Sequence, residues 1–184
     1  MSLPWGGSPG IALLAPVTTV AQAAGAVAAG AALVDAGRDG ALVPAIRGAV
    51  GGVRICGQHE AADLVRDADL AARSGAALIC PGPDAAAAAV RRGVAAERIL
   101  VQAAPAGIEP AVRAGWPVLA DLEGLTDLAG LEGRARTEAV AAVCAWLGAS
   151  VLRTSYLAEV RRCADMTESI LGRRAPAWAV RGLA

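Results

Sequence analysis

One arginine stands where a buried strand is expected to end. The phrase Ser150–Arg153 reads SVLR, and Arg153 closes this short apolar run. Arginine binds phosphate and carboxylate groups through two parallel N–H donors, so a small-anion site is the first chemistry that this residue could support. The alternative is a salt bridge within the protein, for which Asp35, Asp121 and Glu123 are the candidate partners.

The single histidine offers a second kind of chemistry. His59 follows the expected strand Val53–Cys56, and together with Cys56 and Cys80 it could bind a metal ion. No fourth ligand or ligand spacing accompanies these residues, and buried cysteines commonly act as small apolar side chains, so we expect no metal and no cofactor. Glu60 could serve as a general base, but an acidic residue at a helix start is more often simply favourable toward the helix dipole. We therefore name no catalytic residue.

The composition excludes several other classes of function. The 184 residues include seventeen basic side chains, all of them Arg, and neither Lys nor Asn occurs. A Schiff-base lysine and the lysine of a phosphate-binding P-loop are thereby excluded. Seventeen acidic residues bring the net charge to zero, so no overall field attracts nucleic acid or anionic lipid. At 55% hydrophobic and 18% charged, residues 1–184 are expected to form one globular domain.

An alanine-rich apolar run over residues 11–34 has some features of a signal peptide, with Ala21-Gln22-Ala23 as the cleavage site. No basic residue precedes the run, and Pro16 and several glycines interrupt it, so we expect neither a signal peptide nor a membrane span. The four cysteines show no CxxC pair and no disulfide-scaffold spacing. These features favour a cytoplasmic protein.

Short apolar runs alternate with helical segments along the chain. Because the runs are continuously apolar, they are typical of parallel strands buried on both faces. Seven strands are expected: Ile11–Ala15, Ala32–Asp35, Val53–Cys56, Ala77–Cys80, Ile99–Gln102, Pro117–Ala120 and Ser150–Arg153. The helices expected between and after them are Val20–Ala29, Pro44–Val50, Glu60–Ser74, Pro83–Arg92, Glu109–Ala114, Arg134–Leu147 and Leu157–Leu171.

A glycine joins several of these helices to the next strand, as in ARSGAALIC, VRAGWPVLA and AWLGASVLR. This phrase indicates repeated βα units with right-handed crossovers. Such units form either a closed barrel or an open doubly wound sheet. No G-x-G-x-x-G follows the first strand, so we expect an α/β fold of the TIM-barrel type. The chain is short for an eight-unit barrel of about 250 residues, and only seven strands are recognisable.

In order and spacing, the segments resemble dihydropteroate synthase, the pterin-binding barrel of folate synthesis, over almost the whole chain. The phrase LGASVLRTSYLAEVRRCADM is similar to the family's last strand and helix, and AGAALVDAGRDG to its second-strand phrase. Two further phrases, RRGVAAERILVQAAPAG and GWPVLADLEGLTDLAG, are similar to those of the sixth and seventh strands. The resemblance implies a shortened barrel in which Pro83–Arg92 connects the family's fourth strand directly to its sixth, so that the fifth strand is missing.

The resemblance also implies where a pterin would bind. The family uses an Asp after its third strand, an Asn after the fourth, an Asp after the sixth and a Lys after the seventh. In this chain the corresponding positions fall at or near Gly57, Cys80, Gln102 and Glu123 or Gly124. Since leaving a buried polar group unpaired costs about 1–3 kcal/mol, strong pterin binding is not expected.

The family's anion-binding positions are partly retained. At the eighth strand Arg153 is kept and Ser155 replaces a histidine, while Asp35 is kept in the second-strand phrase. The resemblance thus implies a site of Arg153, Ser155, Asp35 and Gln102 that binds a phosphate or a pterin diphosphate in a protein without synthase activity. Such a protein would act as a non-catalytic or partner-dependent binding protein.

Two alternatives remain open. The chain could be a working transferase of folate biosynthesis that is completed by a partner chain or by substitutes such as Gln102, Asp121 and Arg153, or it could be an unrelated barrel acting on another phosphorylated metabolite. Synthases of this family pair through their late helices. The resemblance therefore implies either a homodimer through Arg134–Leu147 and Leu157–Leu171 or a protein partner.

Overall fold

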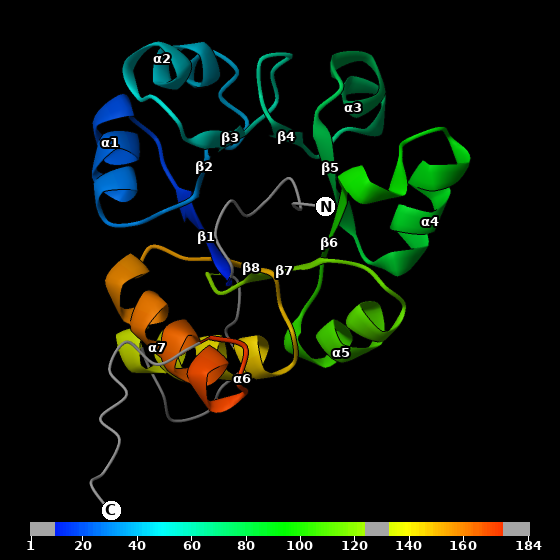
Figure 1. Ribbon diagram of the computed structural model, residues 1–184. Helices are drawn as coiled ribbons and strands as arrows, with labels where there is room; N and C mark the ends of the chain where they lie inside the picture. Colours follow the sequence, from blue (N-terminus) through cyan, green and yellow to red (C-terminus); the bar gives the residue numbers. More distant parts are fainter. Residues whose placement is uncertain (1–9, 124–132, 175–184) are drawn as a thin grey trace, which may run out of the picture.

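The protein forms a closed barrel of eight parallel strands surrounded by helices (Figure 1). The structure is a computed structural model that describes residues 10–123 and 133–174. The strands are β1 (Ala12–Pro16), β2 (Leu33–Asp35), β3 (Arg54–Cys56), β4 (Leu64–Val65), β5 (Ala77–Pro81), β6 (Ile99–Gln102), β7 (Val118–Asp121) and β8 (Val151–Arg153). They follow one another around the ring, and β1 pairs with both β2 and β8. The predicted barrel class is confirmed.

Helices connect most of these strands on the outside of the ring. Within the described residues they are α1 (Val20–Ala28), α2 (Leu42–Ala49), α3 (Ala68–Ser74), α4 (Pro83–Arg91), α5 (Pro105–Arg113), α6 (Gly133–Trp146), α7 (Leu157–Ile170) and the short 3-10 helix η1 (Ala96–Arg98). Gly75 ends α3 with a φ of 77°, a left-handed conformation that a residue with a Cβ adopts at a cost. Gly148 has the same role before β8, with a φ of 98°.

The prediction of seven strands with the fifth one missing was wrong. The strand that the sequence did not reveal is β4, which pairs with β3 on one side and with β5 on the other. It lies inside the predicted helix Glu60–Ser74, of which only the part from Ala68 onward is helical. An apolar pair is too short a run to be recognised as a strand beside a helical pattern. Ala77–Pro81 is consequently the fifth strand of the barrel and not the fourth.

The shortening of the barrel lies between β3 and β4, where residues 57–63 form no helix. Parallel strands ordinarily need a crossover of about a dozen residues or more. Here Asp63 fixes the short connection against β3. Its backbone N–H donates to the Ile55 carbonyl at 2.8 Å, and its Oδ2 accepts from the Ile55 N–H at 2.8 Å. Arg47 on α2 donates to the same Oδ2 at 2.7 Å, which attaches the connection to its neighbouring helix.

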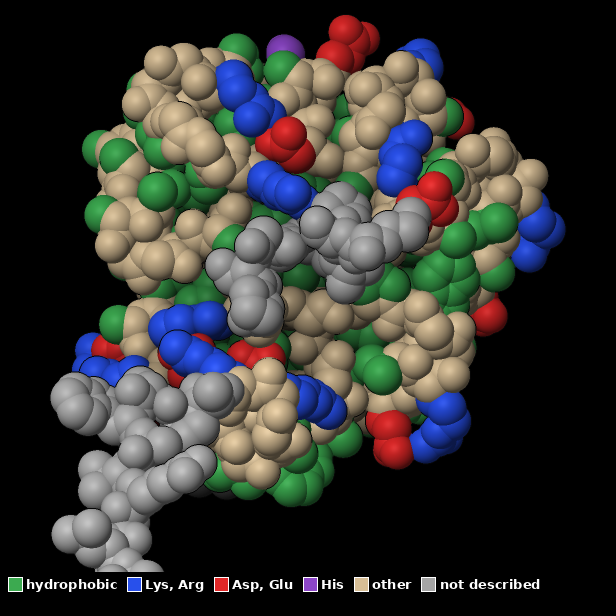
Figure 2. All heavy atoms as spheres, in the orientation of Figure 1, with side chains coloured by type: hydrophobic (Ala, Val, Ile, Leu, Met, Phe, Trp, Pro, Cys, Tyr) green, Lys and Arg blue, Asp and Glu red, His purple; other side chains and the backbone are tan. Residues whose placement is uncertain are grey.

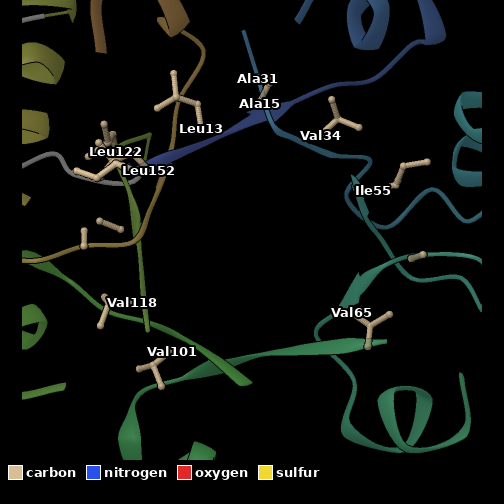
Figure 3. Packing of buried hydrophobic residues seen from close by; sticks show 14 of the residues in the cluster. Leu13, Ala15, Ala31, Val34, Ile55, Val65, Val101, Val118, Leu122 and Leu152 are labelled. Carbon is tan, nitrogen blue, oxygen red and sulfur yellow. The ribbon is translucent and has the colours of Figure 1, made fainter. Parts of the chain in front are cut away.

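Two apolar layers make the core. The outer layer lies between strands and helices, and Figure 3 shows Val34, Ile55, Val65 and Val101 among its strand residues, on the side of the ring that faces the helices. The inner layer fills the barrel itself and consists of Ala12, Leu14, Leu33, Cys56, Leu64, Ala77, Ile79, Leu100, Leu119 and Val151. The barrel interior is therefore packed with side chains, as in other barrels of this size.

On the face drawn in Figure 2, basic and acidic side chains are interspersed. This distribution agrees with the zero net charge of the sequence. Among the helices of the described segments, none has the length and apolar character needed to cross a membrane.

Candidate functional site

Strand periodicity brings polar side chains together at the carboxyl end of the barrel. Residues two positions apart on a strand face the same side of the sheet. Leu33, Leu100, Leu119 and Val151 lie in the barrel interior. The residues two positions later on the same strands are Asp35, Gln102, Asp121 and Arg153. The last inward position of each of these four strands is thus polar, in a barrel that is otherwise filled by apolar side chains.

Asp35 is the centre of this polar layer. Asp35 is only 3% exposed, and its carboxylate accepts four hydrogen bonds. Oδ1 accepts from the N–H of Gly37 at 3.0 Å and from Nη1 of Arg66 at 3.3 Å, whereas Oδ2 accepts from Nη2 of Arg66 at 3.1 Å and from Nε of Arg153 at 2.9 Å. A buried carboxylate is stable only when it is paired and hydrogen-bonded in this way.

Arg153 bridges two carboxylates. Its Nε binds Asp35, and its Nη1 lies 3.2 and 3.3 Å from the two oxygens of Asp121. Two of the three partners considered from the sequence are therefore confirmed, while the third, Glu123, instead accepts a hydrogen bond from the backbone N–H of Ser155. With a side chain only 20% exposed, Arg153 is held firmly by the protein's own acidic groups.

Arg66 is the member of this network that sequence reasoning missed. It follows β4 directly, forms a two-pronged ion pair with Asp35, and donates from Nη1 to Sγ of Cys56 at 3.2 Å. The signal was present as a lone arginine after an apolar pair, but it had no meaning until β4 was recognised. Together with Asp35, Asp121 and Arg153, it completes a network whose two positive and two negative charges cancel.

The network shifts the pKa values of its members. Burial by itself would raise the pKa of Asp35, but the hydrogen bonds and charge of Arg66, the N–H of Gly37 and the hydrogen bond from Arg153 bring it below its ordinary value. Burial raises the pKa of the Cys56 thiol to about 12, and the negative charge of Asp35 adds to this effect. At neutral pH Asp35 is thus ionised and Cys56 is a neutral thiol, unsuited to act as a nucleophile.

Gln102 faces a pocket beside the network. The pocket has a volume of about 570 Å³, and it is lined by Pro81, Gly82, Pro83, Gln102, Ala103, Ala104, Gly107 and Asp121. Its polar side chains are the amide of Gln102 and the carboxylate of Asp121, which is 26% exposed. A cavity of this size, mostly apolar with a few polar groups, is typical of a small-molecule site.

Ser155 lies outside the network. It is exposed in the loop that follows β8, and its backbone rather than its hydroxyl contacts Glu123. Of the four sequence-predicted site residues, the structure brings Arg153 and Asp35 into direct contact, places Gln102 in the adjoining pocket, and leaves Ser155 at the rim.

The residues considered for a metal site are not assembled into one. Cys56 belongs to the barrel interior and Cys80 to the outer layer, so their side chains lie on opposite sides of the barrel wall. His59 uses its Nδ1 to accept from the N–H of Ala61 at 3.0 Å, and Glu60 is exposed beside it. Over residues 10–123 and 133–174, no cluster of three or more His, Cys, Asp or Glu side chains could hold a metal ion.

The extra strand also corrects the alignment with the family at the fourth strand. The position that the resemblance assigned near Cys80 belongs to β5, and the end of the fourth strand is Arg66. Arg66 carries a cation that only donates hydrogen bonds and that is already paired with Asp35.

The barrel is similar to several solved structures. The structure of Mycobacterium tuberculosis Rv1207 matches with a TM-score of 0.74 and 28% sequence identity, covering 92% of this chain and 95% of that chain. A dihydropteroate synthase from Yersinia pestis with a pterine-sulfa conjugate matches with a TM-score of 0.73 at 16% identity, over 90% of this chain and 94% of that one. The synthase from Xanthomonas albilineans with 4-aminobenzoic acid matches with a TM-score of 0.74 at 18% identity, over 88% of this chain and 93% of that one.

No protein-family model matches the sequence, and no curated protein does so either. The similarity to dihydropteroate synthases is one of structure: it extends over about nine-tenths of the chain at low sequence identity. The resemblance drawn from the sequence is confirmed at the level of the fold.

Proposed function

We propose that this chain is a dihydropteroate-synthase-like binding protein that takes a small phosphorylated or pterin-like ligand at the carboxyl end of its barrel and does not itself make dihydropteroate. The proposal rests on the similarity of fold and on one observation above all. The charge-neutral, partly buried network of Asp35, Arg66, Arg153 and Asp121 occupies the end of the barrel where enzymes of this architecture carry their active sites.

A closed network of this kind disfavours the synthase reaction. Displacing diphosphate requires cationic groups or a metal ion to stabilise the negative charge that develops on the leaving group. Here both arginines of the network already neutralise carboxylates, and the sequence contains no lysine that could replace them. Recognition of a pterin edge would also depend on only two polar side chains in the adjoining pocket, Gln102 and Asp121.

Binding of an anion is still compatible with the geometry. Arg153 commits Nε and Nη1 to carboxylates, whereas its Nη2 forms no hydrogen bond with any of the described residues. Arg66 lies on the other side of Asp35 with its side chain 33% exposed. A phosphate could therefore contact the outer N–H groups of both arginines without breaking the pairs that hold them.

The second candidate is a transferase completed by a partner chain. The pocket of about 570 Å³ favours it, since its volume suits a bicyclic heterocycle and its carboxylate and amide offer complementary hydrogen-bonding groups. In this case a partner would supply the cations for the leaving group, because Arg66 and Arg153 are already paired with carboxylates.

Calorimetry and a turnover assay separate the two candidates. The purified chain would be titrated with 6-hydroxymethylpterin diphosphate and with unphosphorylated pterin, and then incubated with the diphosphate and 4-aminobenzoate. We expect weak binding of the diphosphate, at least about tenfold weaker in Arg153→Ala, unchanged in Arg38→Ala, and no product. Arg38 is a matched control because it is exposed in the loop after β2. Product formation by the chain alone would overturn the proposal.

We also propose that the chain forms a homodimer through α6 and α7. These helices lie side by side (Figure 1), and Arg134 of α6 is paired with Glu159 of α7 at 3.2 Å. Their outer faces carry the most exposed large apolar side chains of the described residues: Val143 at 51%, Trp146 at 57%, Met166 at 59% and Ile170 at 68%. An apolar surface on adjacent helices favours burial against a partner.

A further inference from the structure

A second pocket lies at the opposite, amino-terminal end of the barrel. It has a volume of about 380 Å³, and its lining comprises Arg54, Ala62, Asp63, Ser74, Gly75, Ala76, Ala77 and Arg98. These residues come from the starts of β3 and β5 and from the segments that lead into β4, β5 and β6. Two of them, Ala62 and Asp63, belong to the helix-free connection between β3 and β4.

Arg54 is a cation in this pocket that is paired with no carboxylate of the described residues. It is the first residue of β3, two positions before the inward-facing Cys56. Its side chain is therefore directed toward the amino-terminal end of the barrel interior. Its half-buried side chain forms no ion pair with residues 10–123 or 133–174. The terminal segments 1–9 and 175–184 contain no Asp or Glu residue.

Arg98 supplies a second guanidinium with the same property. Its Nη2 donates to the carbonyl of Ala71 at 2.8 Å and to the carbonyl of Ala76, which holds the side chain against the end of α3. These partners are neutral carbonyl groups, and its buried Nε has no hydrogen-bond partner in the described structure. The position of Arg98 is therefore fixed, while its charge has no counterion within residues 10–123 and 133–174.

The one carboxylate in the lining does not offset these charges. Oδ2 of Asp63 accepts from Nη2 of Arg47 at 2.7 Å and from the N–H of Ile55 at 2.8 Å. Because Arg47 does not line the pocket, it neutralises Asp63 from outside. Two positive charges then remain around a cavity large enough for a small molecule, a combination that marks a candidate binding site.

We propose that this pocket binds the phosphate or carboxylate group of a small molecule between Arg54 and Arg98. Guanidinium groups bind both oxyanions through charge-assisted hydrogen bonds, and a ligand held there would supply the negative charge that the protein does not. The site is independent of the carboxyl-end network, since the two pockets share no residue.

Inorganic phosphate is the probe for this site, titrated by calorimetry in phosphate-free buffer. The Arg153→Gln variant serves as the background, so that only the amino-end pocket is measured. Phosphate binding should persist in this background, weaken at least about tenfold when Arg54→Gln is added, and stay unchanged when Arg73→Gln is added. Arg73 is exposed near the end of α3 but does not line the pocket, which makes it the matched control.

A folded Arg153→Gln variant that binds no phosphate would overturn the proposal, and so would an Arg54→Gln substitution without effect. If Arg153→Gln does not fold, the same comparison is made between Arg54→Gln and Arg73→Gln in the unaltered chain, with crystals soaked in tungstate to place the anion. Density beside Arg54 supports the inference, whereas tungstate only at the carboxyl end contradicts it. Loss of diphosphate binding at Arg153 alone would affect the proposed function and leave this site untouched.

Discussion

Nε of Arg153 lies 2.9 Å from Oδ2 of Asp35, although β1 separates their strands in the sheet. The contact spans 118 positions of sequence and is possible because both side chains point into the barrel. It joins the last strand to the second over the end of the first. The ion pair therefore helps to hold the closed ring together at the point where the first and last strands pair.

Replacing Asp35 should destabilise the protein strongly. In Asp35→Asn the two arginines lose their shared counterion and are left partly buried with like charges, and breaking a buried pair in this manner costs about 3–5 kcal/mol. The free energy of unfolding, measured with urea, should fall by that amount. Asp69→Asn, at an exposed position of α3, should change it by less than about 0.5 kcal/mol. Equal losses in the two variants would show that the network contributes little.

The same carboxylate should make stability depend on acid. Because the pKa of Asp35 is lowered in the folded protein from an ordinary value of 3.8, the unfolded chain binds its proton more tightly. The contribution of Asp35 is therefore fully present above pH 3.8 and is lost as the pH falls from there through the lowered pKa. Urea unfolding between about pH 6 and about pH 2.5 should show a steeper loss in the natural chain than in Asp35→Asn. Parallel curves would assign the acid sensitivity to other groups.

Particular residues show what the sequence could and could not predict. Seven strands were predicted to within one residue at each end, because their continuous apolar runs and preceding glycines are local signals. β4 was not predicted, since two residues carry no periodicity, and Arg66 was missed with it. Arg153 was recognised as an anion ligand or an ion-pair partner, but only the closed ring shows that it contacts Asp35 and Asp121 at once.

Thiol reactivity should follow burial. Burial raises the pKa of Cys56 to about 12, with help from Asp35, and that of Cys144 to about 11, so neither offers a thiolate at neutral pH. Cys163 on α7 is partly exposed and should be alkylated first by iodoacetamide in the folded protein. Peptide mass spectrometry after timed labelling would follow each site, and unfolding in urea should make all of them react. Labelling of Cys56 as fast as Cys163 in the folded state would mean that the polar end of the barrel opens readily.

The proposed dimer predicts a position-dependent effect of charge. Trp146→Arg places a cation among the exposed apolar side chains of α6 and α7, and it should weaken association at least about tenfold. Val90→Arg is the control, because Val90 is also exposed, at 40%, but lies on α4, away from those helices (Figure 1). Sedimentation equilibrium would measure both variants beside the unaltered chain. A monomer at every concentration in the unaltered chain would refute the dimer.

Gly57 should be intolerant of even one added methyl group. It follows β3 directly, and a Cβ built there would lie 2.6 Å from Cγ2 of Val43, a fully buried residue of α2. Because neighbouring core side chains cannot yield freely, Gly57→Ala should lower the free energy of unfolding by about 1–3 kcal/mol. Gly25→Ala is the matched control, since Gly25 lies inside α1 and an added Cβ would meet no atom within 4 Å beyond its chain neighbours and its own helix backbone. There the substitution should stabilise the protein by about 0.5–1 kcal/mol, because alanine loses less conformational freedom in a helix than glycine does. Opposite signs in the two urea curves would support the tight β3–β4 connection, whereas stabilisation by both substitutions would show that α2 can move away from it.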